Sequence, residues 1–316
     1  MQPWIRPAPP KIFFRSLPGL CFREEPMGDS PIMPRHAWLP ITPRGVAAFA
    51  AAPLGHLGLA QLIVAAFVAA VAACFVEANW FPAVRDAVSR LPETNAVIRA
   101  GALQWTLPTP ARLGENRFLS LVVDANDTGE LGRAADVEIA LHRTHFTVSS
   151  LLGFVAFPYP RAWTVNLARP EAMPWWGAWE WPILALGMAT VVVVLFVSWF
   201  VLATLYFPVV KAFAFFANRQ LGWRGSWKLS SAALMPGALV VALGILCYGW
   251  LGMDLIQLGL FYAMHFLAGW VFIAVSPFFL PQDPGASALP ANPFATPEDS
   301  GKPSKRKPPN PFSASH

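Results

Sequence analysis

Two aspartates close together in this sequence are of a type that can do chemistry. Asp127-Thr128-Gly129 is the tripeptide of the aspartic proteases, in which two carboxylates share a proton and activate water. That motif follows an apolar strand directly, whereas Asn126 precedes it here, and the chain holds no second copy. We therefore favour a turn shaped by Asp124 and Asp127 over a protease site.

The same segment also has part of the pattern of a calcium-binding loop. Asp124, Asn126 and Thr128 alternate as the first ligands of such a loop do, but Ala135 stands where a bidentate Glu is required. Calcium binding between Asp124 and Glu130 stays open as an alternative.

Two histidines, His142 and His145, form a His-x-x-His motif. We expect them on a strand and at its end, where a step of three residues points side chains to opposite faces. The sequence therefore predicts no metal pair and no cofactor.

A third histidine lies inside an apolar run. His265 is about ten residues from the nearest charge on its N-terminal side. An ionisable group at such depth in a membrane helix marks a candidate functional site. A neutral histidine that is hydrogen-bonded across a helix interface is the alternative.

Long uncharged intervals flank the segment from Asp124 to His145, and one of them contains His265, so the elements that these intervals form must position the candidate residues. Only 13% of the 316 residues are charged, against roughly 25% in a soluble domain. Four intervals without charge are each longer than the roughly 20 residues that a membrane helix needs, and they are 45–76, 181–210, 229–253 and 255–282. The sequence predicts an α-helical polytopic membrane protein with four transmembrane helices and a small α+β extracytoplasmic domain between helices 1 and 2, and it argues against a soluble enzyme.

The first interval is too long for one span, and we expect a break at Pro53. The predicted segments are a cytoplasmic Pro-rich tail (1–44), an interfacial segment with helix 1 (45–79), the α+β domain (80–180), helix 2 (181–207), a basic cytoplasmic loop (208–228), helix 3 (229–251), helix 4 (255–276) and a disordered cytoplasmic tail (281–316). The first span would serve as an uncleaved signal anchor, and either Met1 or Met33 would be the start.

The α+β domain shows both kinds of periodicity. Pro82 begins a short amphipathic helical pattern. Strand patterns follow at 103–107, 118–123, 137–141, 146–148 and 163–167, and the turn residues of 124–130 separate two of these strands.

Basic residues predict the orientation. The two tails and the 211–228 loop together have eight more basic than acidic residues, whereas the 77–180 connection with Asp254 has three more acidic than basic residues. By the positive-inside rule both termini lie in the cytoplasm of a bacterial inner membrane. The 211–228 loop would contact anionic lipid headgroups as an alternative to a plain topology signal, and no nucleic acid is expected as a partner.

Three motifs give the chain a family resemblance, and they are Arg99 to Thr106, Leu121 to Gly129 and Trp227 to Leu239. With the order of segments from Gly45 to Leu280, the chain resembles a bacterial membrane protein family of unknown function that is grouped with the Yip1-type proteins. It departs from the family pattern by the inserted Ala125 and Asn126. The resemblance implies membrane organisation and the binding of partner proteins, and it implies no catalytic residue.

These patterns lead to one functional hypothesis and two alternatives. We expect a non-enzymatic membrane protein whose outer domain senses or binds something, and whose helices pack with each other, with a membrane-protein partner or with a second copy. Close approach of the last helices is expected at five glycines, Gly237, Gly244, Gly249, Gly252 and Gly259. The second hypothesis is a transporter or transport accessory that uses His265, and the third is a membrane-surface protease or lipid-modifying enzyme.

Overall fold

The computed structural model describes residues 40–132 and 134–282. The chain divides into a unit of residues 1–34 and a unit of residues 35–316, and every described residue belongs to the second. The two start sites, nearly all of the predicted Pro-rich tail and the predicted C-terminal tail beyond residue 282 lie outside the described residues.

Helices occupy both ends of the described chain, and eight strands lie between Ser89 and Arg169, of which the sequence predicted five. The helices are α1 (Pro43–Ala48), α2 (Leu54–Phe75), the π-helical turn Val76–Trp80, α3 (Phe81–Ser89), α4 (Arg169–Phe216), α5 (Trp223–Ala233), α6 (Met235–Trp250), α7 (Leu255–Val275) and the 3₁₀ turn Ser276–Phe279. The strands are β1 (Val97–Arg99), β2 (Ala102–Gln104), β3 (Ala111–Glu115), β4 (Leu119–Val123), β5 (Val137–Leu141), β6 (His145–Ser150), β7 (Gly153–Pro158) and β8 (Thr164–Asn166).

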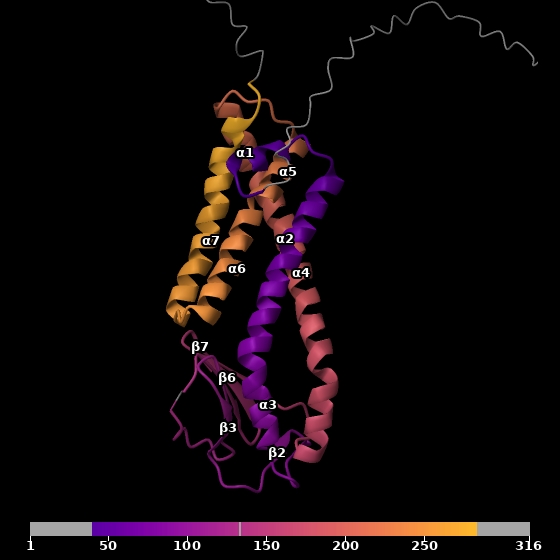
Figure 1. Cartoon of the computed structure of the whole chain (residues 1–316), viewed down its shortest axis with the longest axis vertical. Helices are drawn as coiled ribbons and strands as arrows, with labels where there is room; N and C mark the ends of the chain where they lie inside the picture. The colour runs from indigo at the N-terminus through magenta and orange to yellow at the C-terminus, as the bar shows by residue number, and fades with distance from the viewer. Residues whose placement is uncertain (1–39, 133, 283–316) are drawn as a thin grey trace, which may run out of the picture. The chain divides into compact units, whose positions relative to one another are not determined.

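Among the described residues, four helical stretches are long and apolar enough to cross a membrane (Figure 1). They are Leu54–Ser89, Arg169–Phe216, Trp223–Trp250 and Leu255–Phe279. Each overlaps one uncharged interval of the sequence. The protein is thus a mixed structure of four long apolar helices and two small sheets.

Prolines set two of the helix boundaries. The predicted break at Pro53 is confirmed, because α2 begins at Leu54 with Pro53 as its N-cap. A second break, which the sequence did not predict, separates α5 from α6 at Leu234. Pro236 lacks the N–H that would bond to the carbonyl of Ala232, so the helix cannot continue regularly there.

Helix α4 is longer than the predicted 181–207 span at both ends. It runs for 48 residues and contains Pro174, Pro182 and Pro208. Its N-terminal turns pack on α3, where the rings of Phe81 and Trp176 are 5.2 Å apart and Arg85 forms an ion pair with Glu180. These tertiary contacts explain why the helix begins before the apolar run.

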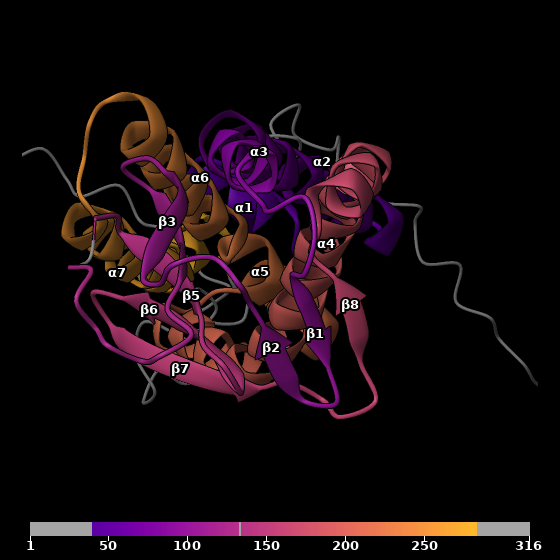
Figure 2. The same ribbon diagram turned by 90° about the horizontal axis from the view of Figure 1, so that it is seen from below.

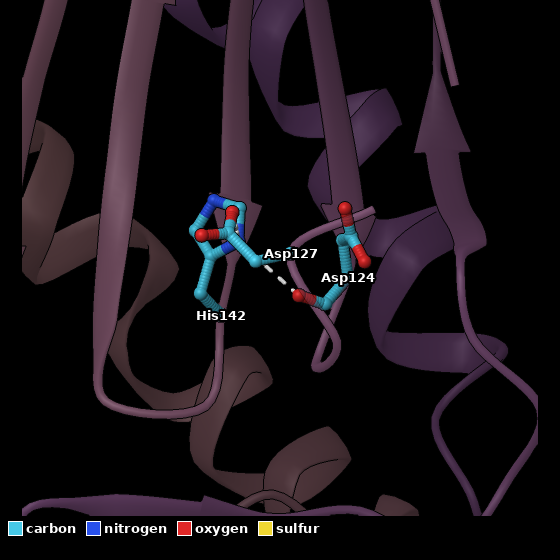
Figure 3. Close-up of side chains that lie close together, drawn as sticks. All are labelled: Asp124, Asp127 and His142. Carbon is cyan, nitrogen blue, oxygen red and sulfur yellow. Dashed lines mark hydrogen bonds and ion pairs between the residues drawn. The ribbon is translucent and has the colours of Figure 1, made fainter. Parts of the chain in front are cut away.

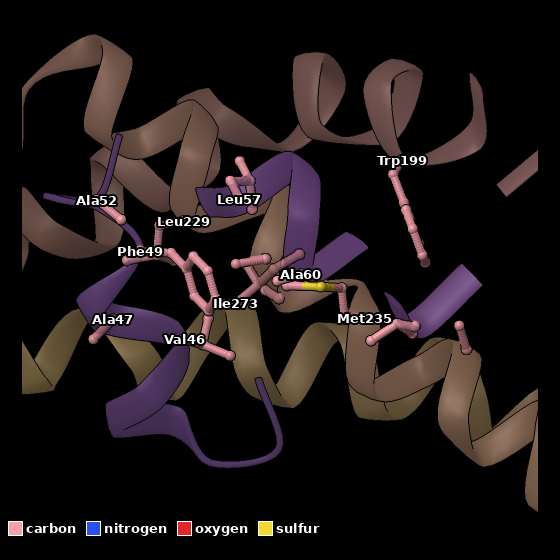
Figure 4. Close-up of a cluster of buried hydrophobic side chains, with 14 of the residues drawn as sticks. Val46, Ala47, Phe49, Ala52, Leu57, Ala60, Trp199, Leu229, Met235 and Ile273 are labelled. Atoms are coloured by element: carbon pink, nitrogen blue, oxygen red, sulfur yellow. The ribbon is translucent and has the colours of Figure 1, made fainter. Parts of the chain in front are cut away.

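The core of the helix bundle lies where α1, α2, α4, α5, α6 and α7 meet (Figure 4). Its most buried large side chains include Val46, Phe49, Leu57, Leu229, Met235 and Ile273. One polar pair is enclosed in this region, since Gln61 Nε2 donates to Ser231 Oγ at 2.8 Å. The bundle is therefore held mainly by apolar contact.

The strands form two sheets. One has the order β2-β1-β8 and is antiparallel, and the other has the order β3-β4-β5-β6-β7. Only the β4–β5 pair of the larger sheet is parallel. Its connection, residues 124–136, has about the dozen residues that a parallel crossover needs. Figure 2 shows β7 at the outer edge of the larger sheet.

Helix α3 lies closely on β3. A Cβ at Gly114 would lie 2.2 Å from the carbonyl oxygen of Ala83 and 2.8 Å from the backbone nitrogen of Ala87. Only glycine allows this approach. The contact fixes α3, which continues from the first long helix, against the sheet that carries the candidate site.

Candidate functional site

The parallel pairing of β4 with β5 brings two candidate side chains together. Asp124 follows β4 directly and His142 follows β5 directly, and Val123 pairs with Leu141. Carboxyl ends of parallel neighbours meet at one edge of a sheet, and the Asp124 N–H donates to the Leu141 carbonyl at 2.9 Å. Asp127 reaches the same place from the following loop (Figure 3).

Asp124 is the anchor of a tight turn. Its Oδ2 accepts from the Gly129 N–H at 2.9 Å, and its Oδ1 accepts from the Thr128 hydroxyl at 3.2 Å. The Asp127 N–H donates to the Asp124 carbonyl at 3.2 Å, and Asp127 has a φ of 57°. The turn that the sequence predicts at 124–130 is confirmed.

The protonation of Asp124 follows from this turn. Burial opposes the charged form, since Asp124 is only 5% exposed. Hydrogen bonds from Gly129 and Thr128, together with the nearby His142, outweigh burial and hold the pKa of Asp124 below its ordinary value. The carboxylate is therefore charged and bound to its own loop at neutral pH.

His142 connects this turn to the neighbouring strands. Its Nδ1 lies 3.1 Å from Asp127 Oδ1 and 3.1 Å from the Asp124 carbonyl oxygen, and its Nε2 contacts the Thr147 hydroxyl. Two acceptors face Nδ1, so we assign the proton to that nitrogen. The buried Tyr159 donates to the His142 carbonyl at 3.1 Å, and burial raises the pKa of its phenol.

The cluster has the atoms of a cation site but uses most of them itself. The ligand atoms of Asp124, Asp127 and His142 lie within 4.8 Å of one another. Both Asp124 oxygens and His142 Nδ1 already take part in hydrogen bonds within the protein. Only Asp127, whose side chain is 73% exposed, offers a largely open carboxylate. A cation would have to displace the bonds that shape the loop.

The same contacts place Asp127, His142 and Thr147 in the order carboxylate, imidazole, hydroxyl. This order is that of a hydrolase triad. Thr147, however, lies within β6 and pairs with Ala140 on one side and Ala156 on the other. Its backbone is committed to the sheet and supplies no free N–H for an oxyanion.

The expectation that His142 and His145 point to opposite faces was wrong. Their rings stack with centroids 4.6 Å apart at 17°, so they do not point to opposite faces. Arg143 and Thr144 form a turn, because Leu141 pairs with Phe146 across the β5–β6 hairpin. A two-residue turn between two apolar alternations was the signal in the sequence. Sequence reasoning considered His142 only as half of a metal pair and missed its contacts with Asp124 and Asp127.

His265 lies apart from this cluster, in the helix bundle. It lines a cavity of about 380 Å³ with residues of α2, α4, α6 and α7, including Ser198, Trp199 and Tyr206. Its Nδ1 bonds to the Tyr262 carbonyl in its own helix, and its ring lies 3.8 Å from that of Phe266. The alternative of a bond across a helix interface finds no support in these contacts.

Glycines bring α6 and α7 together beside this cavity. A Cβ at Gly237 would lie 2.7 Å from the His265 carbonyl oxygen, and one at Gly244 would lie 2.6 Å from Phe261 Cβ. The close approach predicted for these two glycines is confirmed. Gly249 instead lies against Phe75 of α2, and Gly259 has no atom within 4 Å of its Cβ position, so the expectation was wrong there.

Specific contacts join the sheet domain to the turn between α6 and α7. Arg117 donates to the carbonyls of Gly252 and Met253, and Gly252 has the positive φ of this turn. Tyr248 donates to Asp136 Oδ2 at 2.6 Å. Asp136 ends the segment that begins at Asp124, so one connection holds both the candidate site and a helix contact.

The comparisons with known proteins identify no relative. No family model matches the chain, and no curated protein or solved structure matches it. The function therefore has to follow from the geometry of the chain itself.

Proposed function

We propose that this chain is a non-enzymatic bacterial inner-membrane protein with four spans and cytoplasmic termini. Its α+β domain, residues 80–180, is outside and senses or binds a partner. The Yip1-type grouping and its partner-binding role belong to this proposal and rest on the sequence motifs. Lipids surround the spans, and a membrane-protein partner or a second copy is the expected companion.

One observation carries the proposal: the 124–136 connection contains the Asp124 turn at one end and the Asp136–Tyr248 hydrogen bond at the other. Phe118 supports that link, because its ring packs against Phe75 and Tyr248 at centroid distances of 5.4 and 5.0 Å. A ligand that moves this connection would act on two of the long helices. Such a link fits sensing better than catalysis.

Three of the four basic side chains of the 211–228 loop are hydrogen-bonded to backbone carbonyls of the protein itself. Lys211 donates to the Leu221 carbonyl, Arg219 to the Leu280 carbonyl at 2.7 Å, and Lys228 to the Ala52 carbonyl at 2.7 Å. Anionic headgroups remain part of the proposal as secondary partners of this loop. The outer domain is the main candidate for partner binding.

The proposal is tested at the 124–136 connection. Tyr248→Phe should raise hydrogen exchange in residues 124–136 of the protein in lipid nanodiscs, because Asp136 loses its donor. Tyr262→Phe is the matched control, since Tyr262 is exposed on α7. A photo-crosslinking residue at position 127 should capture a partner in native membranes, whereas one at the exposed Gln104 should not. Unchanged exchange together with no captured partner would reject the proposal.

The cavity at His265 favours a second candidate function, transport or assistance to transport. The cavity is apolar except for groups such as His265, Ser198 and Tyr206, and its volume lies within the roughly 300–1,000 Å³ of small-molecule sites. In liposomes with an internal pH dye, His265→Leu should change proton or solute uptake, and His56→Leu is the control. Equal uptake by His265→Leu and the unaltered protein would remove this candidate.

A further inference from the structure

The β6–β7 hairpin ends in a turn whose residues are unsuited to water. Ser150 pairs with Gly153, so Leu151 and Leu152 form the whole loop. Two-residue hairpin loops usually contain Gly, Asn or Asp, which tolerate the backbone angles and bind water. Here Leu152 is 92% exposed.

The apolar character continues along β7. Phe154 is 74% exposed, Val155 56% and Phe157 45%. No Asp, Glu, Lys or Arg occurs between Arg143 and Arg161. Edge strands in water are normally protected by charge, proline or a cover, and this edge has a proline only at its last residue, Pro158.

The turn also lies beside the long helices. Leu151 and Leu152 line one apolar cavity of about 530 Å³ with residues of α6 and α7, among them Ile245, Ile256 and Tyr262. Tyr262 is seven residues into α7, or about 10 Å along its axis at 1.5 Å per residue. Ile256, which is 67% exposed on α7, lines the same cavity, so the exposed apolar surface of α7 adjoins the turn there.

We propose that the tip of this hairpin, residues 151–154, inserts into the outer leaflet of the bilayer beside α6 and α7, with lipid acyl chains as its partner. The inference rests on the proposed function, because it needs α6 and α7 to be in the membrane. Acyl chains fit better than a second copy of the chain, since the tip shares an apolar cavity with two spans.

Spin labels in the full-length protein test the depth of the tip. The three cysteines are first replaced (Cys21→Ser, Cys74→Ala, Cys247→Ala), and single labels are then attached through Leu152→Cys, Leu107→Cys and Leu260→Cys. Leu107 is 46% exposed outside the hairpin and serves as the water control, and Leu260 is 61% exposed on α7 and serves as the lipid control. In nanodiscs of phosphatidylethanolamine and phosphatidylglycerol, each label is relaxed by oxygen or by a water-soluble nickel chelate.

The expected result is a ratio of oxygen to nickel accessibility at position 152 that matches position 260 and is several-fold above that at position 107. A label at Phe154→Cys should give the same result if the position 152 variant folds poorly. If position 260 is in lipid but 152 and 154 behave like 107, the hairpin inference fails and the proposed function stands. If position 260 itself is in water, both fail. If the label at position 152 is shielded from both reagents and its spectrum is broadened by a second label nearby, the hairpin pairs with a second copy. That result would overturn the lipid assignment.

Discussion

The outer sheet domain and the helix bundle each hold a candidate histidine, but by different means. His142 contacts the Asp124 carbonyl, Asp127 and Thr147, which come from the loop after β4 and from β6. His265 bonds to a carbonyl three residues earlier in its own helix. The first arrangement exists only when the sheet is folded, whereas the second needs only a helix. Changes in sheet packing should therefore disturb the His142 cluster, and changes at His265 should leave the fold intact.

The largest loss of folding stability is expected from Gly114→Ala. The new Cβ would meet backbone atoms of α3, which cannot move as a flexible side chain can. Overpacking of this kind costs typically about 1–3 kcal/mol and occasionally more, and we expect the upper end. Hydrogen exchange of the β3 and β4 amides measures the loss, and Gly132→Ala is the control because its Cβ position is open. Equal exchange in the two variants would contradict the tight α3–β3 contact.

A smaller loss of folding stability is expected from Asp124→Asn. The amide keeps one acceptor but loses the charge that Gly129 and Thr128 stabilise, at a cost of about 1–3 kcal/mol. Asp127→Asn removes only an exposed partner of His142 and should cost no more than about 1 kcal/mol. Chemical denaturation followed by exchange at 119–141 separates the two. The turn would not depend on the Asp124 charge if the order of effects were reversed.

The pH dependence follows from the same carboxylate. Its pKa is lowered in the folded protein from an ordinary value of 3.8, so its stabilisation is complete above that value. The stabilisation is lost as the pH falls through the lower, folded pKa. Protection factors in β4 and β5 should therefore drop below about pH 4 in the unaltered protein and change less in Asp124→Asn. A drop of the same size in both would assign the acid sensitivity to other carboxylates.

The smallest effect on stability is expected from His265→Leu. The variant loses one hydrogen bond within its own helix, and even hydrogen bonds between membrane helices are worth only about 0.6 kcal/mol on average. Leucine keeps the cavity wall apolar, so the unfolding temperature in nanodiscs should shift by only a few degrees at most. A large fall in the unfolding temperature would show that His265 holds helices together, and it would contradict the difference proposed between His265 and His142.

Several parts of this structure were predictable because they depend on local chemistry. Long uncharged runs predict membrane-length helices, because an apolar segment of this length needs no contact with water. Pro53 interrupts the helical pattern because it has no N–H to donate. The Asp124 turn was predictable because Asp, Asn and Gly are the residues that such turns require. The strands β1, β3 and β7 were not predicted, and β7 was missed because its apolar residues do not alternate with polar ones.

The candidate site itself was only half predictable. Asp124 and Asp127 are close in sequence, but His142 joins them only because β4 and β5 pair in parallel. No residue pattern in the two strands distinguishes parallel from antiparallel pairing. The loop between them is too long for its path to follow from its residues.

The sequence by itself determined where the chain is apolar, where it turns and which segments are helical, because these depend on side-chain hydration and on backbone angles near each residue. Tertiary structure alone decided that His142 meets Asp124, that Gly114 receives α3, and that the Leu151–Leu152 turn lies beside α6 and α7. Each of these contacts joins residues that are distant in sequence. Their formation depends on how whole faces pack together, and no local pattern records that.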